Sequence, residues 1–238
     1  MLSKQGAWLS GVVRDYGWAA GTFLGSLPRD VAASLVERSV RLSFPAGRVI
    51  LREGALDSHV FLLLSGFVKV TTAVEGVETL LGIRLPGEVV GEIGALTGEP
   101  RNATVSASGP LVAGRLQRGD FEAFLRQRPD ASALIAAAVA RQLRWANRRR
   151  TDFAAFPAPI RLARVLSEMA EVCGRRRSDG SVELLVPLSQ TDLAAMVAIA
   201  QATVEKAAHE LRDQGLITTG YRRIVITDPS ALRKLADP

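Results

Sequence analysis

Short apolar runs, separated by turn residues, fill the first half of the 238-residue chain. Val60–Leu64 and Phe67–Val70 lie on either side of a turn, and several shorter runs follow, up to Val112–Ala113. Their spacing of about 8–12 residues, with glycine and proline between them, is typical of an all-β sandwich or roll. The segment Leu27–Arg38, which precedes the strands, has the pattern of a helix. The first half is therefore expected to be a β-domain with a helix in front of it.

The pattern changes after Pro129, where the chain becomes rich in alanine. No glycine or proline interrupts Asp130–Phe153, so we expect one long helix of about 36 Å. Four apolar residues recur at steps of 4, 4 and 3 and would form a narrow seam of the coiled-coil kind. Such a seam predicts pairing with the same helix of a second copy; packing only against its own β-domain is the alternative. The seam consists of Ile135, Val139, Leu143 and Ala146.

Proline residues divide the long helix from the C-terminal part of the chain. Pro157 and Pro159 end the helix and mark a domain boundary. We expect a further helix over Ile160–Val172, and we interpret Arg175–Gly180 as an exposed, solvated basic loop.

The segment from Leu188 to Ile226 has the order of a winged helix-turn-helix. Ser189 and Asp192 have the spacing of a capping box, which begins a short helix. A second helix ends before Gly215, a residue that favours helix C-termini. The expected elements are a helix (Gln190–Met196), a turn (Val197–Ile199), a helix (Gln201–Gln214) and two strands (Leu216–Ile217 and Ile224–Ile226) joined by a basic turn.

In this motif the second helix lies in the major groove, and its first residues meet the base edges. Gln bonds adenine, Lys reaches guanine, Glu accepts from cytosine and Ala contacts the thymine methyl group. Phosphate contacts would fix the register of the protein on the duplex. A three-helix protein-interaction module is the alternative. The expected base-reading residues are Gln201, Ala202, Glu205 and Lys206, and the expected phosphate contacts are Thr203, Arg222 and Arg223.

The net charge of +6 is concentrated in the second half. Residues 1–120 contain 12 Lys/Arg and 11 Asp/Glu, whereas residues 121–238 contain 18 and 13. A basic C-terminal half agrees with a polyanionic partner such as double-stranded DNA.

Composition also excludes several classes of protein. One cysteine, Cys173, cannot form an intramolecular disulfide or hold an iron–sulfur cluster, and two distant histidines make a metal site improbable. Neither a 20-residue apolar run nor a secretory signal is present, so we expect a cytoplasmic protein without a membrane partner. No nucleophile–base constellation indicates an enzyme.

Two segments of the β-domain, Pro86–Leu96 and Pro100–Thr104, form a Gly-Glu…Pro-Arg-x-Ala-Thr cassette. Together with the long helix and the winged motif, they resemble the CRP/FNR (cyclic-AMP receptor protein and fumarate–nitrate regulator) family of bacterial regulators. The resemblance implies an α+β fold, with an N-terminal cyclic-nucleotide-binding-type β-roll, a long dimerisation helix and a C-terminal winged helix-turn-helix. The implied divisions are an N-terminal extension (1–21), whose aromatic residues Trp8, Tyr16 and Trp18 could pack on the roll, a sensor domain (22–128), a dimerisation helix with hinge (129–156) and a DNA-binding domain (157–238).

In family members that bind cyclic nucleotides, this cassette is a phosphate cradle. The resemblance implies that Gly91 allows close backbone approach, Arg101 neutralises the phosphate and Glu92 accepts from a ribose hydroxyl. The alternative is that Glu92 and Arg101 only pair with each other. Asn102 replaces the usual hydroxyl residue beside the arginine, and Ala146 and Asn147 stand where such members contact adenine.

Cyclic AMP is therefore a doubtful ligand, because Ala146 can neither donate nor accept a hydrogen bond. Another cyclic nucleotide, a different small molecule and no ligand remain open. The second helix of the DNA-binding motif begins Ala200-Gln201-Ala202, where many members have Ser-Arg-Glu, so the preferred operator should differ.

The combined prediction is a homodimeric transcription regulator that binds a palindromic operator. RNA polymerase is a further candidate partner implied by the resemblance. A cyclic-nucleotide-binding signalling module whose C-terminal helices bind a protein is the alternative from another class.

Overall fold

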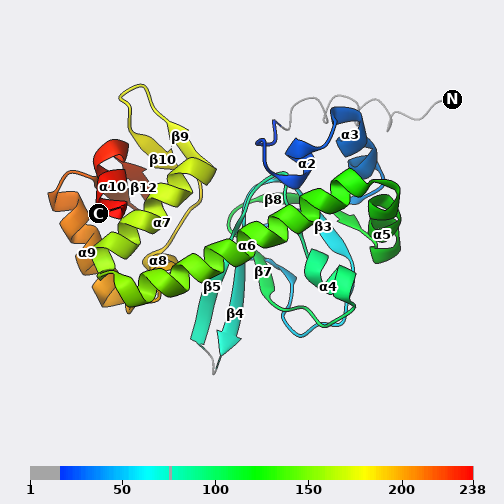
Figure 1. The fold of residues 1–238 in the computed structure, drawn as a ribbon, viewed down its shortest axis with the longest axis horizontal. Helices are drawn as coiled ribbons and strands as arrows, with labels where there is room; N and C mark the ends of the chain where they lie inside the picture. Colours follow the sequence, from blue (N-terminus) through cyan, green and yellow to red (C-terminus); the bar gives the residue numbers. More distant parts are fainter. Residues whose placement is uncertain (1–16, 75–76, 238) are drawn as a thin grey trace. The chain divides into compact units, whose positions relative to one another are not determined.

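The computed structural model describes residues 17–74 and 77–237, so Trp8 and Tyr16 lie outside the described residues. Two compact units are present. The first comprises the described residues up to Thr72 together with Gly82–Gln142, and the second comprises Ala73–Leu81 and the residues from Leu143 onward. One continuous helix, α6 (Pro129–Ala155), carries the chain from the first unit into the second (Figure 1).

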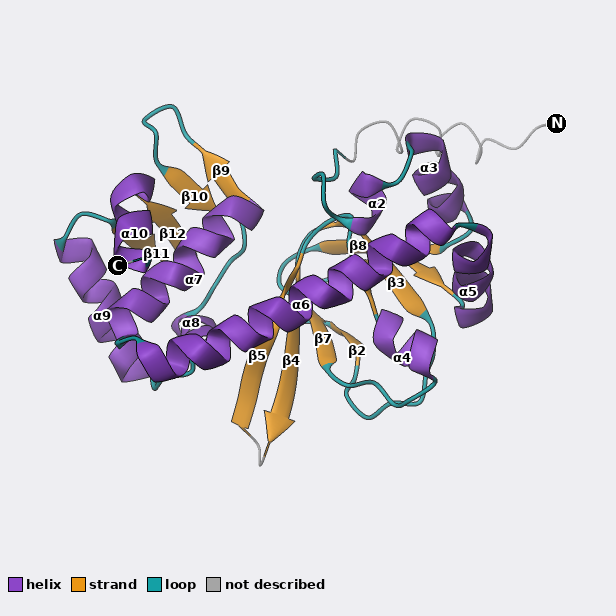
Figure 2. Ribbon diagram, viewed as in Figure 1, coloured by secondary structure: helices purple, strands orange, loops and turns teal. Residues whose placement is uncertain are grey.

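Two antiparallel four-stranded sheets form the β-roll predicted for the first half (Figure 2). Their strand orders are β1-β8-β3-β6 and β2-β7-β4-β5. Two clusters of buried apolar side chains line the sheets, and β3 contributes to both because its residues alternate between its two faces. The strands are β1 (Val40–Phe44), β2 (Val49–Leu51), β3 (Val60–Ser65), β4 (Val68–Val74), β5 (Val77–Arg84), β6 (Val89–Val90), β7 (Thr104–Ala107) and β8 (Leu111–Leu116).

Short helices cover one of these clusters. Phe23 packs edge-to-face on both Phe121 and Phe124, with ring centroids 6.5 Å apart in each pair. Trp18 packs on the same cluster and donates its indole hydrogen to the Leu64 carbonyl at 3.1 Å. The helices are α2 (Phe23–Ser26), α3 (Arg29–Glu37), α4 (Glu92–Thr97) and α5 (Arg118–Gln127); the predicted helix over Leu27–Arg38 is shorter because Pro28 has extended backbone.

The apolar residues of α6 do not form one continuous seam. Ile135 is buried in the core of its own β-roll, together with Ala131, so its assignment to a pairing seam was wrong. Val139 and Leu143 are exposed by 37% and 61%, and Ala146 is also exposed. The apolar periodicity correctly predicts a helix, but the first turns of α6 pack on the β-roll of the same chain. Of the four predicted seam residues, only the last three are exposed.

The second unit combines helices with a four-stranded antiparallel sheet of order β11-β12-β10-β9. The segment interpreted as a solvated basic loop, Arg175–Gly180, begins within a strand, because β9 pairs with β10 along the sheet edge. The elements are α7 (Ala158–Cys173), β9 (Gly174–Arg176), β10 (Val182–Leu184), α8 (Gln190–Val197), α9 (Gln201–Asp213), β11 (Ile217–Gly220), β12 (Arg223–Ile226) and α10 (Pro229–Ala236).

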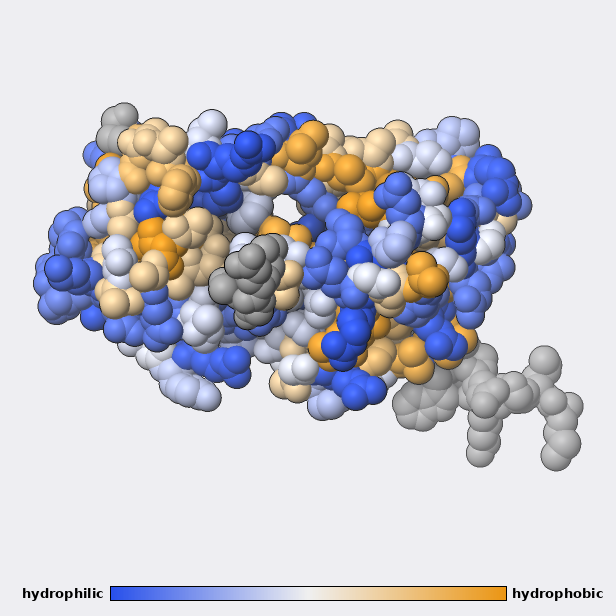
Figure 3. Space-filling model, turned by 90° about the horizontal axis from the view of Figure 1, so that it is seen from below, coloured by the Kyte–Doolittle hydropathy of each residue, from blue (hydrophilic) through white to orange (hydrophobic). Residues whose placement is uncertain are grey.

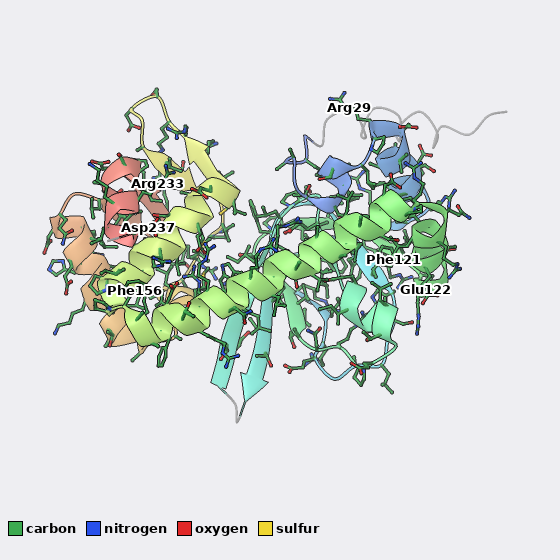
Figure 4. All side chains as sticks on the ribbon, in the orientation of Figure 1. Arg29, Phe121, Glu122, Phe156, Arg233 and Asp237 are labelled. Carbon is green, nitrogen blue, oxygen red and sulfur yellow. The ribbon has the colours of Figure 1, made fainter. Side chains whose placement is uncertain are left out.

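The last turns of α6 are tied to α7 and α10 by ion pairs within the second unit. Asp152 is 3% exposed, and its carboxylate lies 3.1 Å from Arg164 Nε and 3.5 Å from Arg149 Nη1. Arg149 also pairs with Glu168. Asp237, which Figure 4 labels, follows the last residue of α10. Arg164 pairs with it at 3.1 Å. A buried carboxylate therefore holds two arginines where α6 ends.

Candidate nucleic-acid interface and effector pocket

The start of α8 is fixed by the capping box that the sequence predicts. The Ser189 amide donates to Asp192 Oδ2 at 2.7 Å, and the Asp192 amide donates to Ser189 Oγ at 3.1 Å. The helix continues to Val197, one residue beyond its predicted end. Ala198 then adopts φ 52°, which turns the chain sharply into α9. Ala200, the N-cap of α9, offers no side-chain hydrogen bond.

One face of α9 is buried and the other is polar and exposed. Val204, Ala207, Ala208 and Leu211 are buried at helical spacing, which anchors the helix on its own unit. In Figure 3, hydrophilic residues lie along the left edge of the view, the side on which α9 lies in Figure 1, with hydrophobic residues beside them. All five residues expected to contact DNA from this helix are on the exposed side: Gln201, Ala202, Thr203, Glu205 and Lys206.

The exposed side chains at the start of α9 contact one another and α8. Gln201 Nε2 donates to Glu205 Oε1 at 3.1 Å, and its Oε1 accepts from Thr191 Oγ1 at 3.4 Å. The first turn of α9 thus lies beside the first turn of α8. These bonds orient the Gln201 amide and the Glu205 carboxylate. Both groups can exchange these hydrogen bonds for hydrogen bonds to base edges.

The wing is the hairpin of β11 and β12, and its turn is strongly exposed. Tyr221 is 93% exposed, and Arg222 has φ 51°. Arg223 differs from Arg222, because it lies on β12 and donates from Nε to Glu183 Oε1 at 2.7 Å. A cleft of about 270 Å³ separates this turn from the start of α8 and is lined by Ser189, Gln190, Leu193, Tyr221, Arg222 and Arg223, with neighbouring residues.

Sequence reasoning missed the carboxylate that binds Arg223 of the wing together with two arginines of the β9–β10 hairpin. Glu183 Oε2 accepts from Arg175 at 2.9 Å and from Arg177 at 3.0 Å, in addition to the bond from Arg223 to Oε1. These three guanidinium groups lower the pKa of Glu183 to about 2. The sequence signal for this cluster was the spacing of Arg175 and Arg177. They are two residues apart at the end of a strand, and alternate residues of a strand lie on the same face.

A pocket of the first unit surrounds the predicted cradle. Its lining includes Gly91, Glu92, Arg101 and Asn102. Gly91 has φ 87°, and a Cβ there would lie 2.8 Å from Arg101 Nη1 and 2.9 Å from Leu51 Cδ1. Only glycine combines that conformation with so close an approach to these two side chains. The expected approach of the Gly91 backbone to a ligand stays a prediction.

Arg101 is 3% exposed and already holds three acceptors of the chain. Its Nε donates to Asp57 Oδ1 at 2.5 Å, Nη1 to the Gly91 carbonyl at 2.7 Å and Nη2 to the His59 carbonyl at 2.5 Å. The alternative that Arg101 and Glu92 only pair with each other is therefore wrong. The remaining hydrogens of Nη1 and Nη2 can still bind an anion.

Glu92 is 7% exposed and is held from α6. Gln142 Nε2 donates to Glu92 Oε1 at 3.4 Å, and Arg84 lines the same pocket. Burial raises the pKa of Glu92, while its own amide, Arg84 and Gln142 partly oppose the rise. Gln142 and Arg84 were not expected from the sequence. Asn147 is exposed on α6 in the second unit and is not among the lining residues.

The sequence also predicts that the protein has no metal site and no membrane-spanning helix. Across residues 17–74 and 77–237, His, Cys, Asp and Glu side chains do not gather in groups of three or more that could hold a metal ion. Within the same ranges, every helix is too short or too polar to cross a bilayer.

Comparison with known proteins accounts for both units. Residues 41–128 match the cyclic nucleotide-binding domain family, and residues 160–235 match the Crp-like helix-turn-helix domain family. The chain belongs to the CRP/FNR family of transcription regulators. The expected fold and the expected class of function, a DNA-binding transcription regulator, are thereby confirmed. The alternative, a cyclic-nucleotide-binding signalling module whose C-terminal helices bind a protein, is not favoured.

Relatives in the CRP/FNR family match nearly the full length of the chain. A CRP-like cAMP-activated global transcriptional regulator of Mycobacterium tuberculosis is 28% identical over 218 residues, which covers 91% of this chain and 96% of the relative. The cyclic AMP receptor protein of Thermus thermophilus is 28% identical over 215 residues, covering 90% and 95%. A solved CRP-family regulator from Thermus thermophilus, TTHB099, has a TM-score of 0.69 at 27% identity, covering 83% of this chain and 97% of that structure.

Proposed function

We propose that two copies of the chain bind a palindromic DNA operator, with α9 of each copy in the major groove of one half-site. The exposed polar face of α9 carries this proposal, because its other face is fully committed to the core. The helix N-terminus, which enters the groove in this motif, lies beside the start of α8. The uncovered apolar residues Val139 and Leu143 on α6 support pairing between copies.

Each exposed residue has a role that follows from its chemistry. Gln201, Glu205 and Lys206 would contact base edges, and Ala202 would contact a thymine methyl group. Phosphates would be bound by Thr203 on α9 and by Arg222 and Arg223 at the wing. Of the two wing arginines, Arg222 is the stronger candidate, because Arg223 already shares Glu183.

The effector proposed for the β-roll is a cyclic nucleotide. The match to the cyclic nucleotide-binding family and the cAMP-related names of two relatives support this class. The anion would bind Arg101 beside Gly91 and Asn102, and Glu92 would accept from a ribose hydroxyl. Asn147 is proposed as a contact to the base on the family resemblance alone, since it does not line the pocket within one copy of the chain. Ala146 cannot form the hydrogen bond to adenine that cyclic-AMP-binding family members make from this position. This is the reason to compare cyclic GMP with cyclic AMP.

The proposal also covers the organisation and setting of the protein. The functional divisions are residues 1–21, 22–128, 129–156 and 157–238. The regulator would act in the cytoplasm, with DNA and RNA polymerase as partners, and would catalyse no reaction. The named regulators among its relatives support this division of roles.

The operator can be found by selecting bound duplexes from a random pool and measuring affinity by electrophoretic shift. Gln201→Ala and Lys206→Ala should relax base preference, since each removes a base contact worth about 1–3 kcal/mol. Arg222→Ala should weaken binding equally on all sequences and lower the salt slope by about 0.9 for each phosphate that the protein no longer neutralises. Identical behaviour of the three variants, or no sequence-selective, salt-sensitive binding, would contradict the proposal.

The effector is tested separately by calorimetry with cyclic AMP and cyclic GMP. Binding of either nucleotide should disappear in Arg101→Ala, which removes the buried guanidinium. Arg101→Lys keeps the positive charge and checks that loss of binding is not loss of folding. A full response of Arg101→Ala would show that the cradle is not the ligand site.

A further inference from the structure

The β9–β10 hairpin of the second unit, together with Arg223, carries an excess of positive charge. Arg175, Arg177 and Arg223 all donate to the single carboxylate of Glu183. One carboxylate neutralises one guanidinium, so these four side chains keep a net charge of about +2. Asp179 in the turn of the hairpin interacts with Arg177 and lowers the net charge to about +1. Glu183 is 13% exposed, whereas the Arg175 and Arg223 side chains are 65% and 55% exposed. The carboxylate therefore holds the arginines from below while their outer nitrogens face solvent.

The strand register places Arg175 and Glu183 on one face of the sheet. Arg175 is the cross-strand partner of Glu183, and Arg176 is the partner of Val182. Val182 is 4% exposed and lies on the face that packs on the core. Because side chains alternate along a strand, Arg175 and Glu183 lie on the face opposite to Arg176. The hairpin thus contains two neighbouring arginines, one inside the cluster and one outside it.

The cluster is continuous with the surface proposed to bind DNA. Thr191 on α8 contacts Gln201 on α9, and the cleft at the start of α8 is lined on its far side by Arg222 and Arg223. Arg223 then shares Glu183 with Arg175. In the sheet, β9 is three strands from β11, a distance of roughly 14 Å at about 4.8 Å per strand. That distance corresponds to about four further base pairs at 3.4 Å each.

We propose that Arg175 and Arg177 bind DNA backbone phosphates flanking the half-site, so that the β9–β10 hairpin extends the contact surface of the wing. The inference rests on the proposed DNA binding by α9 and adds a segment of duplex that α9 and the wing do not reach. The partner in this proposal is the phosphate backbone and not the base edges. Glu183 holds the two arginines in fixed positions, so they present a pair of hydrogen-bond donors suited to phosphate oxygens. An acidic protein surface is the competing partner.

The test compares Arg175→Ala with Arg176→Ala in the full-length protein. Both variants remove one arginine and one charge from the same hairpin, and Glu183 keeps two partners in the first. The selected operator is used as a minimal palindrome and as a duplex lengthened by about eight base pairs at each end, about twice the estimated reach. Affinity is measured over a series of salt concentrations, with Gln201→Ala as the control for half-site recognition.

On the lengthened duplex, Arg175→Ala should reduce the salt slope by about 1.8, since each copy of the dimer then binds one phosphate fewer. On the minimal palindrome its slope should equal that of the unaltered protein, and Arg176→Ala should change neither. Equal effects of the two variants on the salt slope would overturn the inference, and so would an Arg175→Ala effect that does not depend on duplex length. In either case, relaxed base preference of Gln201→Ala would still show that α9 binds the operator. Unchanged DNA binding with reduced transcription from a reconstituted promoter would assign the cluster to a protein partner instead.

Discussion

The ion pairs of Arg164 allow the effect of burial to be measured at constant distance. Arg164 lies 3.1 Å from Asp152 and 3.1 Å from Asp237, but the two carboxylate side chains are 4% and 76% exposed. Asp152→Asn leaves Arg164 and Arg149 facing a neutral amide in a buried site. Removing one partner of a buried pair costs about 3–5 kcal/mol. Because Arg149 keeps Glu168 and Arg164 keeps Asp237, we expect the lower end, about 3 kcal/mol.

The matched change, Asp237→Asn, removes an exposed pair, and such pairs contribute at most about 1 kcal/mol. Equilibrium urea unfolding, followed by circular dichroism, gives both values if the dependence on urea concentration is unchanged. Asp152→Asn should also lower the Tm by roughly 6–12 °C, at about 2–4 °C for each kcal/mol in a chain of this size. Equal losses for the two variants would refute the reasoning, because burial would then not decide the strength of the pairs.

Two further changes test the recognition helix and the pocket. Ala200→Ser should stabilise the protein by about 1 kcal/mol, because a hydroxyl at this extended N-cap position can accept from a backbone amide of the first turn of α9; calorimetry should show a higher Tm, and an unchanged value would contradict the cap geometry. Burial raises the pKa of Glu92, so its contribution to the free energy of unfolding is greatest at low pH and is lost as the pH rises through the raised pKa. Glu92→Gln should therefore increase the free energy of unfolding at pH 7 more than at pH 4 in urea unfolding, and an equal effect at both pH values would be inconsistent with this account.

Much of the fold follows from local patterns in the sequence. The capping box of Ser189 and Asp192 and the buried spacing of Val204 and Leu211 involve residues within two helical turns. Such patterns act through short-range backbone hydrogen bonds and one local apolar face, so they can be interpreted without knowing the rest of the fold. The family cassette around Gly91 was visible for the same reason, since a tight turn requires particular residues at particular positions.

Tertiary structure alone decided which surface or partner each side chain meets. Periodicity placed Ile135 and Leu143 on one helical stripe, but the β-roll covers the first and leaves the second exposed. One of the two interpretations of the sequence paired Glu92 with Arg101, whereas the fold brings in Asp57, 44 residues away. Glu183 likewise meets Arg223 across 40 residues of chain. Charges attract through space, so the choice of partner for each of these distant ionic side chains is determined by the approach of strands and helices.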